Sequence, residues 1–268
     1  MTDFIDKNFP REVEFLKSLV RVPSDNPPGD CARHADVAAR ELEQLGFAVE
    51  RHRVPEAVVK KHGMTSATNL VIRERFGSGK GPVIALNAHG DVVPPGEGWT
   101  HDPYGAEEKG GAIYGRGAAV SKSDFATYAF AMLALKDRPE GLDGTIELHL
   151  TYDEEIGGYT GPKWLLDEKI TRPDYAISAG FSYAVVTAHN GVLHLEITVR
   201  GKQAHAAMPE TGADALEAAN AILTALYAER KRLARKNSKT PGIGSAKITV
   251  GLISGGFATN VVPDRDLG

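Results

Sequence analysis

The sequence predicts an α/β fold, with a mostly parallel or mixed sheet sandwiched by helices, and a smaller, partial α+β unit after it. Over residues 1–190, segments with the apolar period of helices alternate with short β-like segments, which is typical of a layered fold. After Asn190 the strand patterns alternate apolar and polar residues, as in a sheet with one wet face. We therefore expect a domain boundary near Gly191, which gives domains of 1–190 and 191–268.

Each element follows from a local pattern. Residues 11–21 carry apolar residues on one helical face, and three prolines then end that helix. A second amphipathic helix, 31–45, ends before Gly46, a natural C-cap residue. The same periodicity predicts the later helices, which cover 123–137, 161–168 and 214–236. Alternating or continuous apolar runs predict the strands, which cover 47–54, 65–77, 81–89, 111–120, 145–152, 175–191, 192–201 and 245–256.

Composition limits the classes of function. Apolar residues make up 42% and charged residues 25% of the chain, which is ordinary for a globular protein. A net charge of -4 gives no reason to expect nucleic acid or an anionic membrane as a partner. No apolar run approaches the roughly 20 residues of a membrane helix, and no secretory signal is recognisable. Because Cys31 is the only cysteine, no internal disulfide can form, and we expect a cytoplasmic protein.

Two polar clusters occur where predicted strands end. His-Gly-Asp at 89–91 ends one strand, and Asp-Glu-Glu at 153–155 follows another. Ligands of open α/β sheets bind beyond the carboxyl ends of the strands. A histidine near carboxylates suits zinc, and of two adjacent glutamates one can hold the metal while the other takes a proton from its water. Taken singly, each cluster is more often an ordinary loop, so neither alone predicts a function.

Longer motifs together resemble one metallohydrolase family. They are NPPGD at 26–30, HGDVVPPGEGWTHDPYGAEEKGGAIYGRGAA at 89–119, DEEIGG at 153–158, AHNGVLHLEITVRGKQAHAAMP at 188–209 and GGFATNVVPDR at 255–265. The sequence resembles the zinc-peptidase family of acetylornithine deacetylase, succinyl-diaminopimelate desuccinylase, aminoacylase and the carboxypeptidase G type peptidases. The resemblance implies a catalytic metallohydrolase domain at 1–190 and a dimerisation or lid domain at 191–268.

The resemblance also implies roles for residues of the first domain. His89 matches the first metal-binding histidine, and Asp91 matches the aspartate that accepts a hydrogen bond from that imidazole and fixes its orientation. Glu154 matches the general base, and Glu155 matches a metal ligand. The implied cofactor is Zn²⁺, with Co²⁺ or Mn²⁺ as alternatives.

In the second domain the resemblance implies two further site residues. His205 matches a histidine that reaches the active site of a partner subunit and stabilises the oxyanion, and Asn260 matches an asparagine that helps to hold the substrate. Members of the family are usually dimeric through this domain. The resemblance therefore implies a homodimer acting on an N-acyl amino acid or a small peptide.

The sequence departs from the family pattern at three expected ligands. Val120 stands where the family has the aspartate that bridges two metals, and Ala179 stands at a later carboxylate ligand. The last ligand, a histidine, would lie beyond Gly268, so we expect the chain to be a C-terminally truncated fragment, or else a fold with an incomplete sheet. Two dications 3.5 Å apart repel each other by roughly 19 kcal/mol at an effective dielectric constant of 20. Without the bridging carboxylate, one ion is therefore favoured over two.

Asp124 is the candidate replacement for the missing aspartate, because it follows Val120 by one helical turn. It also fits the start of a helix, where a carboxylate is favoured, and the two roles are compatible if one carboxylate oxygen serves each. His149 and Asp153 are weaker substitutes. Three functions stay open: a metal-dependent amidohydrolase, a single-metal variant of that enzyme, and a catalytically silent homologue with a binding or assembly role.

Overall fold

The structure is a computed structural model, and it describes residues 2–180 and 184–264. The chain divides into two compact units, Met1–Phe181 and Ser182–Gly268, so the division falls slightly before the boundary predicted near Gly191. Each unit is described by itself. The catalytic and lid roles assigned to 1–190 and 191–268 stay predictions. Among the described residues, every helix is too short or too polar to span a bilayer.

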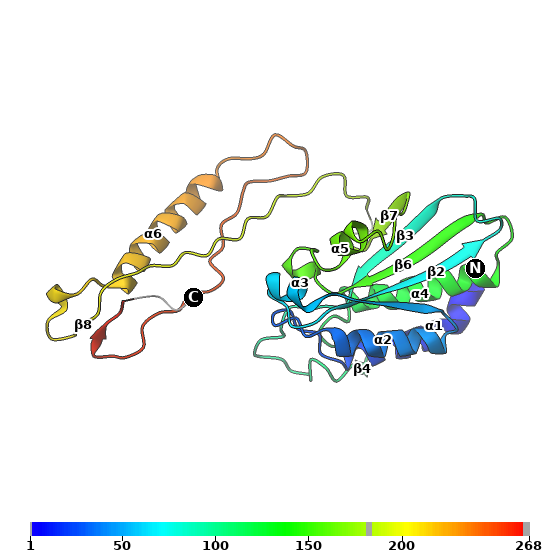
Figure 1. Cartoon of the computed structure of the whole chain (residues 1–268), viewed down its shortest axis with the longest axis horizontal. Coiled ribbons are helices and arrows are strands. Elements are labelled where there is room, and N and C mark those ends of the chain that lie inside the picture. Colours follow the sequence, from blue (N-terminus) through cyan, green and yellow to red (C-terminus); the bar gives the residue numbers. More distant parts are fainter. Residues whose placement is uncertain (1, 181–183, 265–268) are drawn as a thin grey trace. The chain divides into compact units, whose positions relative to one another are not determined.

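A five-stranded mixed sheet forms the centre of the first unit (Figure 1). Its strands, in spatial order, are β1 (Val49–Arg53), β2 (Thr68–Phe76), β6 (Gly144–Thr151), β3 (Val83–His89) and β7 (Tyr175–Ser178). Strand β3 runs parallel to both β6 and β7, whereas β2 is antiparallel to β1 and β6. The predicted α/β class with a mostly parallel or mixed sheet is thus confirmed. The parallel part matters most here, because it brings the carboxyl ends of β3 and β6 side by side.

Helices α1, α2 and α4 lie along one face of this sheet (Figure 1). Alternate residues of β2 and β6, including Leu70, Ile72, Leu148 and Leu150, form the core beneath them and are completely buried. The helices of the unit are α1 (Thr2–Val20), α2 (Ala32–Gln44), α3 (Glu56–Lys61), α4 (Lys122–Asp137) and α5 (Pro162–Asp167). Helix α1 begins nine residues earlier than predicted, at Thr2 instead of residue 11, with Pro10 inside it.

Helix α3 and strand β4 (Glu107–Lys109) were not predicted from the sequence. Helix α3 has too few residues to show a clear period, whereas β4 pairs in a small two-stranded ladder with β5 (Ala112–Tyr114), which lies within the strand predicted at 111–120. Residues 115–120, which were expected to lead from a strand into a turn, contain no strand. This hairpin and the loop before it lie between the end of β3 and the start of α4.

The other face of the sheet carries a buried polar network around Glu147. Its carboxylate accepts hydrogen bonds from Arg73 Nε at 2.8 Å and from the Thr171 hydroxyl, and it lies 2.7 Å from His149 Nε2. Burial by itself would raise the pKa of Glu147, but these partners outweigh it and lower the pKa to about 2. His149 therefore belongs to the sheet network and not to the strand ends.

This network predicts a pH-dependent stability. A carboxylate whose pKa falls from 4.5 to about 2 on folding stabilises the protein above pH 4.5, and this stabilisation disappears as the pH falls from 4.5 to 2. Glu147→Gln should therefore lower the free energy of unfolding by about 3 kcal/mol at pH 7, and the difference from the wild type should narrow below pH 4.5. Urea unfolding between pH 7 and pH 3 measures both. Glu140→Gln, at an exposed position, is the control, and a pH-independent difference for Glu147→Gln would contradict the assignment.

The described part of the second unit contains one long helix and one short ladder. Helix α6 (Ala215–Leu233) is capped by Asp214, whose Oδ1 accepts the backbone N–H groups of Leu216 and Glu217 at 2.8 and 3.0 Å. Strand β8 (Ala204–His205) pairs antiparallel with β9 (Val261–Val262). The predicted helix at 214–236 is therefore confirmed.

The strands predicted at 192–201 and 245–256 are wrong. The described backbone forms no strand over either range, and apolar residues such as Leu193 and Leu195 are largely exposed. Of the strand predicted at 175–191, only β7 is formed among the described residues, and 181–183 lie outside them. An alternating pattern becomes a strand only where a neighbouring strand supplies a continuous run of backbone hydrogen bonds, and no strand of the described part of this unit pairs along these ranges.

Candidate metal centre

The centre lies at the carboxyl ends of two adjacent parallel strands. In the register of β3 and β6, His89 pairs with Thr151, so both strands end at the same level of the sheet. The chain after β6 forms a short 3-10 turn, η1 (Glu154–Ile156), which turns back toward His89. Two segments more than sixty residues apart in sequence therefore place an imidazole and two carboxylates close together.

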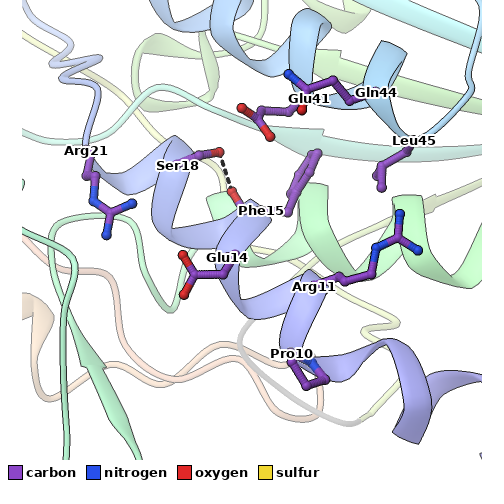
Figure 2. A pocket seen from close by; sticks show the side chains of 9 residues that line it. All are labelled: Pro10, Arg11, Glu14, Phe15, Ser18, Arg21, Glu41, Gln44 and Leu45. Atoms are coloured by element: carbon purple, nitrogen blue, oxygen red, sulfur yellow. Dashed lines mark hydrogen bonds between the residues drawn. The ribbon is translucent and has the colours of Figure 1, made fainter.

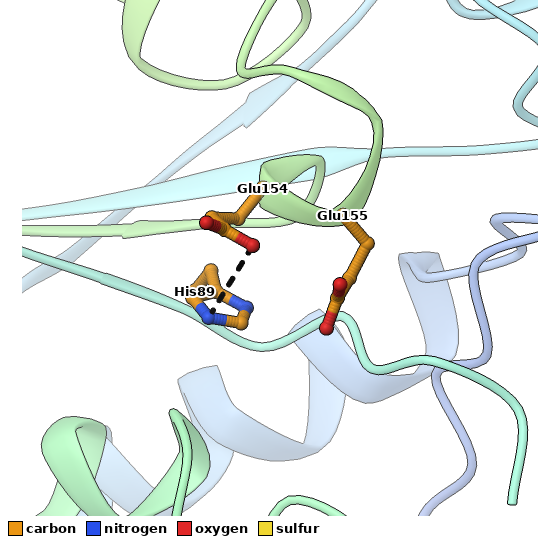
Figure 3. A group of neighbouring side chains, drawn as sticks. All are labelled: His89, Glu154 and Glu155. Atoms are coloured by element: carbon orange, nitrogen blue, oxygen red, sulfur yellow. Dashed lines mark ion pairs between the residues drawn. The ribbon is translucent and has the colours of Figure 1, made fainter. Parts of the chain in front are cut away.

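His89, Glu154 and Glu155 converge on one point (Figure 3). One potential ligand atom from each side chain lies within 4.8 Å of the others. His89 Nε2 and Glu154 Oε2 are 3.8 Å apart. The Glu154 side chain is 62% exposed, so the centre opens to solvent, whereas the imidazole is only 13% exposed. Water can thus reach the two glutamates from one side.

Asp91 is the buried residue that organises these groups. Its carboxylate accepts the backbone N–H of Glu154 and that of Glu155, each at 3.2 Å. His89 Nδ1 lies 3.0 Å from the Asp91 carbonyl oxygen and 3.4 Å from its Oδ1. These contacts favour a proton on Nδ1 and leave Nε2 free to face the glutamates. Asp91 therefore fixes the imidazole and the η1 turn together.

The charges of the centre shift two pKa values. Burial alone would lower the pKa of His89, but the carboxylates of Asp91 and Glu154 outweigh it and raise that pKa. The pKa of Glu155 is raised, first by burial and then by repulsion from Asp91 and Glu154. Acidic groups crowd around one imidazole, and a cation placed among them would relieve their repulsion.

Gly90 is required because an aromatic ring packs against its Cα. A Cβ atom there would lie 2.5 Å from Tyr152 Cε1 and 3.1 Å from Phe125 Cζ. Tyr152 is completely buried, and its hydroxyl lies 3.0 Å from His34 Nδ1. No role for Tyr152 or His34 was predicted from the sequence. The place of Tyr152, directly before the Asp-Glu-Glu cluster, was the only signal available.

The groups present fit a single divalent ion. Ligand atoms about 2.1 Å from a tetrahedral zinc ion lie roughly 3.4 Å apart, so the present separations need only a small contraction. His89 Nε2 and a carboxylate oxygen of Glu155 are ligands that zinc accepts, and the Glu154 carboxylate beside them would face a water in an open position of the ion. No other group of three or more potential metal ligands occurs within the described ranges 2–180 and 184–264.

Asp124 does not join this group of three. Its Oδ2 accepts a hydrogen bond from the Ser121 hydroxyl at 2.7 Å, in the first turn of α4. That contact uses one carboxylate oxygen at the helix start, so its proposed role as a ligand stays a prediction. Asp153 is fully buried and accepts the backbone N–H of Thr160, which directs it toward the loop after η1.

Ala179 lies at the same edge of the sheet as His89. Its backbone N–H donates to the Asn87 carbonyl at 3.2 Å, directly beyond the end of β7. A carboxylate at this position would therefore start from the strand next to His89. Alanine offers no ligand atom there, and neither does Val120 before α4.

His205 and Asn260 are neighbours in the second unit. His205 pairs with Val261 in the short ladder, and the Ala206 N–H donates to the Asn260 carbonyl at 3.0 Å. Both side chains belong to exposed residues. The structure thus brings together the two site residues predicted for this unit, and the metal centre described above consists of residues of the first unit alone.

A surface cavity of about 620 Å³ lies elsewhere, between α1 and α2 (Figure 2). Its lining mixes two arginines with two glutamates, and the Ser18 hydroxyl inside it donates to the Phe15 carbonyl at 2.7 Å. None of the predicted site residues lines it. We therefore place the candidate site at the strand ends, where the chemistry converges.

Comparison with known proteins establishes the family. The profile of peptidase family M20/M25/M40 matches residues 85–255, which includes the whole metal centre. The chain belongs to this family. The resemblance drawn from the sequence motifs is therefore confirmed.

Two similar relatives within the family are curated bacterial proteins. A succinyl-diaminopimelate desuccinylase of Acidiphilium cryptum is 32% identical over 260 residues, and an acetylornithine deacetylase of Proteus mirabilis is 34% identical over 260 residues. Each alignment covers 94% of this chain and 64% of the relative. The chain thus spans about 64% of the length of these M20 relatives.

Solved M20 structures share the fold. A dipeptidase of Saccharomyces cerevisiae aligns with a TM-score of 0.67 and 16% identity, over 98% of this chain and 69% of its own. A metallo-carboxypeptidase of Sulfolobus solfataricus aligns with a TM-score of 0.61 and 16% identity, over 96% of this chain and 69% of its own. At such identities the likeness supports the fold alone.

Proposed function

We propose that this chain is part of a metal-dependent amidohydrolase that cleaves an N-acyl amino acid or a small peptide. The observation that carries the proposal is the convergence of His89, Glu154 and Glu155 at the ends of β3 and β6. Family membership supports it, because the relatives are named as a desuccinylase, a deacetylase and peptidases. Those names favour N-succinyl and N-acetyl derivatives of diamino acids as the first substrates to test.

The ligands of the proposed ion are His89, through Nε2, and Glu155, with Asp124 as a further candidate. A divalent cation, Zn²⁺ or alternatively Co²⁺ or Mn²⁺, supplies Lewis-acid activation of the attacking water and of the scissile carbonyl. An M20 protein of Bacillus subtilis with a solved structure is described as a dinuclear metal-binding peptidase. In this chain Val120 and Ala179 remove two carboxylate ligands, so we propose one ion.

Glu154 is the proposed general base. Its exposed carboxylate reaches the point where His89 and Glu155 converge, so it can accept a proton from the attacking water. The same proton then goes to the nitrogen of the scissile amide, which leaves as an amine while the acyl group leaves as a carboxylic acid. Asp91 keeps the His89 imidazole in the orientation that leaves Nε2 available.

The second unit has a proposed role in substrate binding and assembly. We propose a homodimer formed through this unit, in which His205 of one chain stabilises the oxyanion in the partner's site. Asn260 lies beside His205 and is proposed to hold the substrate. We also propose a cytoplasmic enzyme without nucleic-acid or membrane partners.

The absence of ligand atoms at Val120 and Ala179 favours a second candidate, a catalytically silent homologue that binds a ligand or assembles with a partner. Metal content separates the two. We expect about one zinc, cobalt or manganese ion per chain, and metal-dependent release of amine from N-acetyl or N-succinyl amino acids. Metal analysis after dialysis and an amine-release assay measure these. No bound metal and no turnover, also in a chain extended to the length of its relatives, would favour the silent homologue.

A further inference from the structure

A short segment near the amino terminus packs against the backbone that carries Asp91, next to the metal centre. Residues 24–26 run parallel to 90–92, with the Asn26 N–H donating to the Val92 carbonyl at 2.8 Å and the Val92 N–H donating to the Ser24 carbonyl at 3.1 Å. The Ser24 hydroxyl donates to the Gly90 carbonyl at 2.6 Å. The backbone that carries Asp91 is therefore held on both sides of that residue.

The Asn26 side chain is directed at Asp91. Its Nδ2 donates to Asp91 Oδ2 at 2.9 Å, and both side chains are buried, with Asn26 2% and Asp91 0% exposed. Asn26 Oδ1 is also buried, and it has no hydrogen-bond partner among the described residues. A buried amide that leaves its oxygen unsatisfied costs free energy, so simple packing does not explain an asparagine here. The hydrogen bond to Asp91 explains why an asparagine is present at this position.

That bond completes the set of donors around one carboxylate. Asp91 Oδ1 receives the Glu154 N–H, whereas Oδ2 receives the Glu155 N–H and the Asn26 amide. The Asn26 contact is the shortest of the three. Without the Asn26 hydrogen bond, Asp91 Oδ2 would keep only the long hydrogen bond from Glu155, and the carboxylate could rotate about the Cβ–Cγ bond of Asp91. Rotation would move the contacts that set the His89 imidazole and the η1 turn.

We infer that Asn26 is a positioning residue of the metal centre, which acts by fixing the Asp91 carboxylate and through it His89, Glu154 and Glu155. The inference rests on the proposed metal-dependent function, and it gives a role to the NPPGD motif. Among the described residues, the Asn26 side chain hydrogen-bonds Asp91 and none of His89, Glu154 and Glu155. Its effect on the metal must therefore pass entirely through Asp91, which distinguishes it from a residue that only stabilises the fold.

The test is a double-mutant cycle read by cobalt binding. Co²⁺ affinity is measured by equilibrium dialysis, and ligand geometry by the visible absorption spectrum, for the wild type, Asn26→Ala, Asp91→Asn and the double variant. We expect Asn26→Ala to weaken Co²⁺ binding about tenfold and to change the spectrum, as for other outer contacts of metal ligands. Because both residues act on the same contacts, the double variant should bind no more weakly than Asp91→Asn alone.

Asn8→Ala is the matched control. Asn8 is 9% exposed and donates to the Phe4 carbonyl at 2.8 Å within α1, which carries none of the site residues. It should keep the wild-type affinity and spectrum. If circular dichroism shows that Asn26→Ala is unfolded, Asn26→Ser replaces it in the cycle. The serine hydroxyl is polar, but the side chain is too short to reach Asp91 as the asparagine amide does.

The outcomes are separable. Unchanged affinity and spectrum in the Asn26 variant, with cobalt bound to the wild type, would overturn this inference and leave the proposed function standing. Strictly multiplicative losses in the double variant would do the same, because they would indicate two independent effects. A wild-type chain that binds no cobalt would overturn the proposed function and this inference with it.

Discussion

His89→Ala is expected to abolish stoichiometric metal binding while leaving the fold of the first unit intact. His89 supplies the only nitrogen in the group of three, and the two glutamates that remain, of which Glu154 is 62% exposed, can be neutralised by protons or solvent cations. The imidazole is not part of the main hydrophobic core, so its removal creates no core cavity. Metal analysis after dialysis, with circular dichroism to check folding, measures both results.

His101→Ala is the matched control for this variant. His101 also lies beside a glutamate, with Nδ1 2.7 Å from Glu107 Oε2, but it belongs to no group of three potential ligands in the described residues. Its loss should leave the metal content unchanged. One ion per chain retained by His89→Ala would contradict the whole scheme.

Glu154→Gln is expected to lower kcat by about 10³-fold with little change in metal content. Glutamine keeps the size of the side chain but cannot accept the proton of the attacking water, and general-base catalysis contributes roughly 10²- to 10⁴-fold. The Glu154 backbone N–H, which binds Asp91, is unaffected by the substitution. Steady-state kinetics of amine release and metal analysis of the same sample provide the two readouts.

Glu140→Gln, at an exposed position after α4, is the control and should keep full activity. A Glu154→Gln variant that turns over as fast as the wild type would remove Glu154 from the role of base. Loss of metal together with activity would instead assign Glu154 to the ligands.

The sequence predicted the parts of the fold whose signals are local. The apolar run before His89 and the alternation around Leu148 and Leu150 each mark a strand and its end, so the two clusters of site residues could be placed at one edge of the sheet. The failures were strands that need a distant partner. Residues 192–201 have the right alternation, but pairing depends on a neighbour that the local sequence does not specify.

The hydrogen bonds that support the site residues could not be predicted from the sequence, for a related physical reason. The NPPGD motif was visible in the sequence. The hydrogen bond between Asn26 and Asp91, however, joins residues 65 positions apart, and the local sequence around either residue does not predict it. The same holds for the contact of Tyr152 with His34, across 118 positions. Asp124 was correctly placed at a helix start, because that signal lies within one turn of helix.

These contacts join residues that are far apart in the sequence, and this separation has a consequence for the rate of folding. The hydrogen bonds that fix Asp91 join it to partners 63, 64 and 65 residues away, so each requires the closure of a long loop. Contacts of this kind form slowly, because the chain loses entropy before it gains the interaction. The pairing of β3 with β6 closes a loop of the same length, since His89 pairs with Thr151, so we expect the geometry that receives the cation to form together with this pairing and not before it.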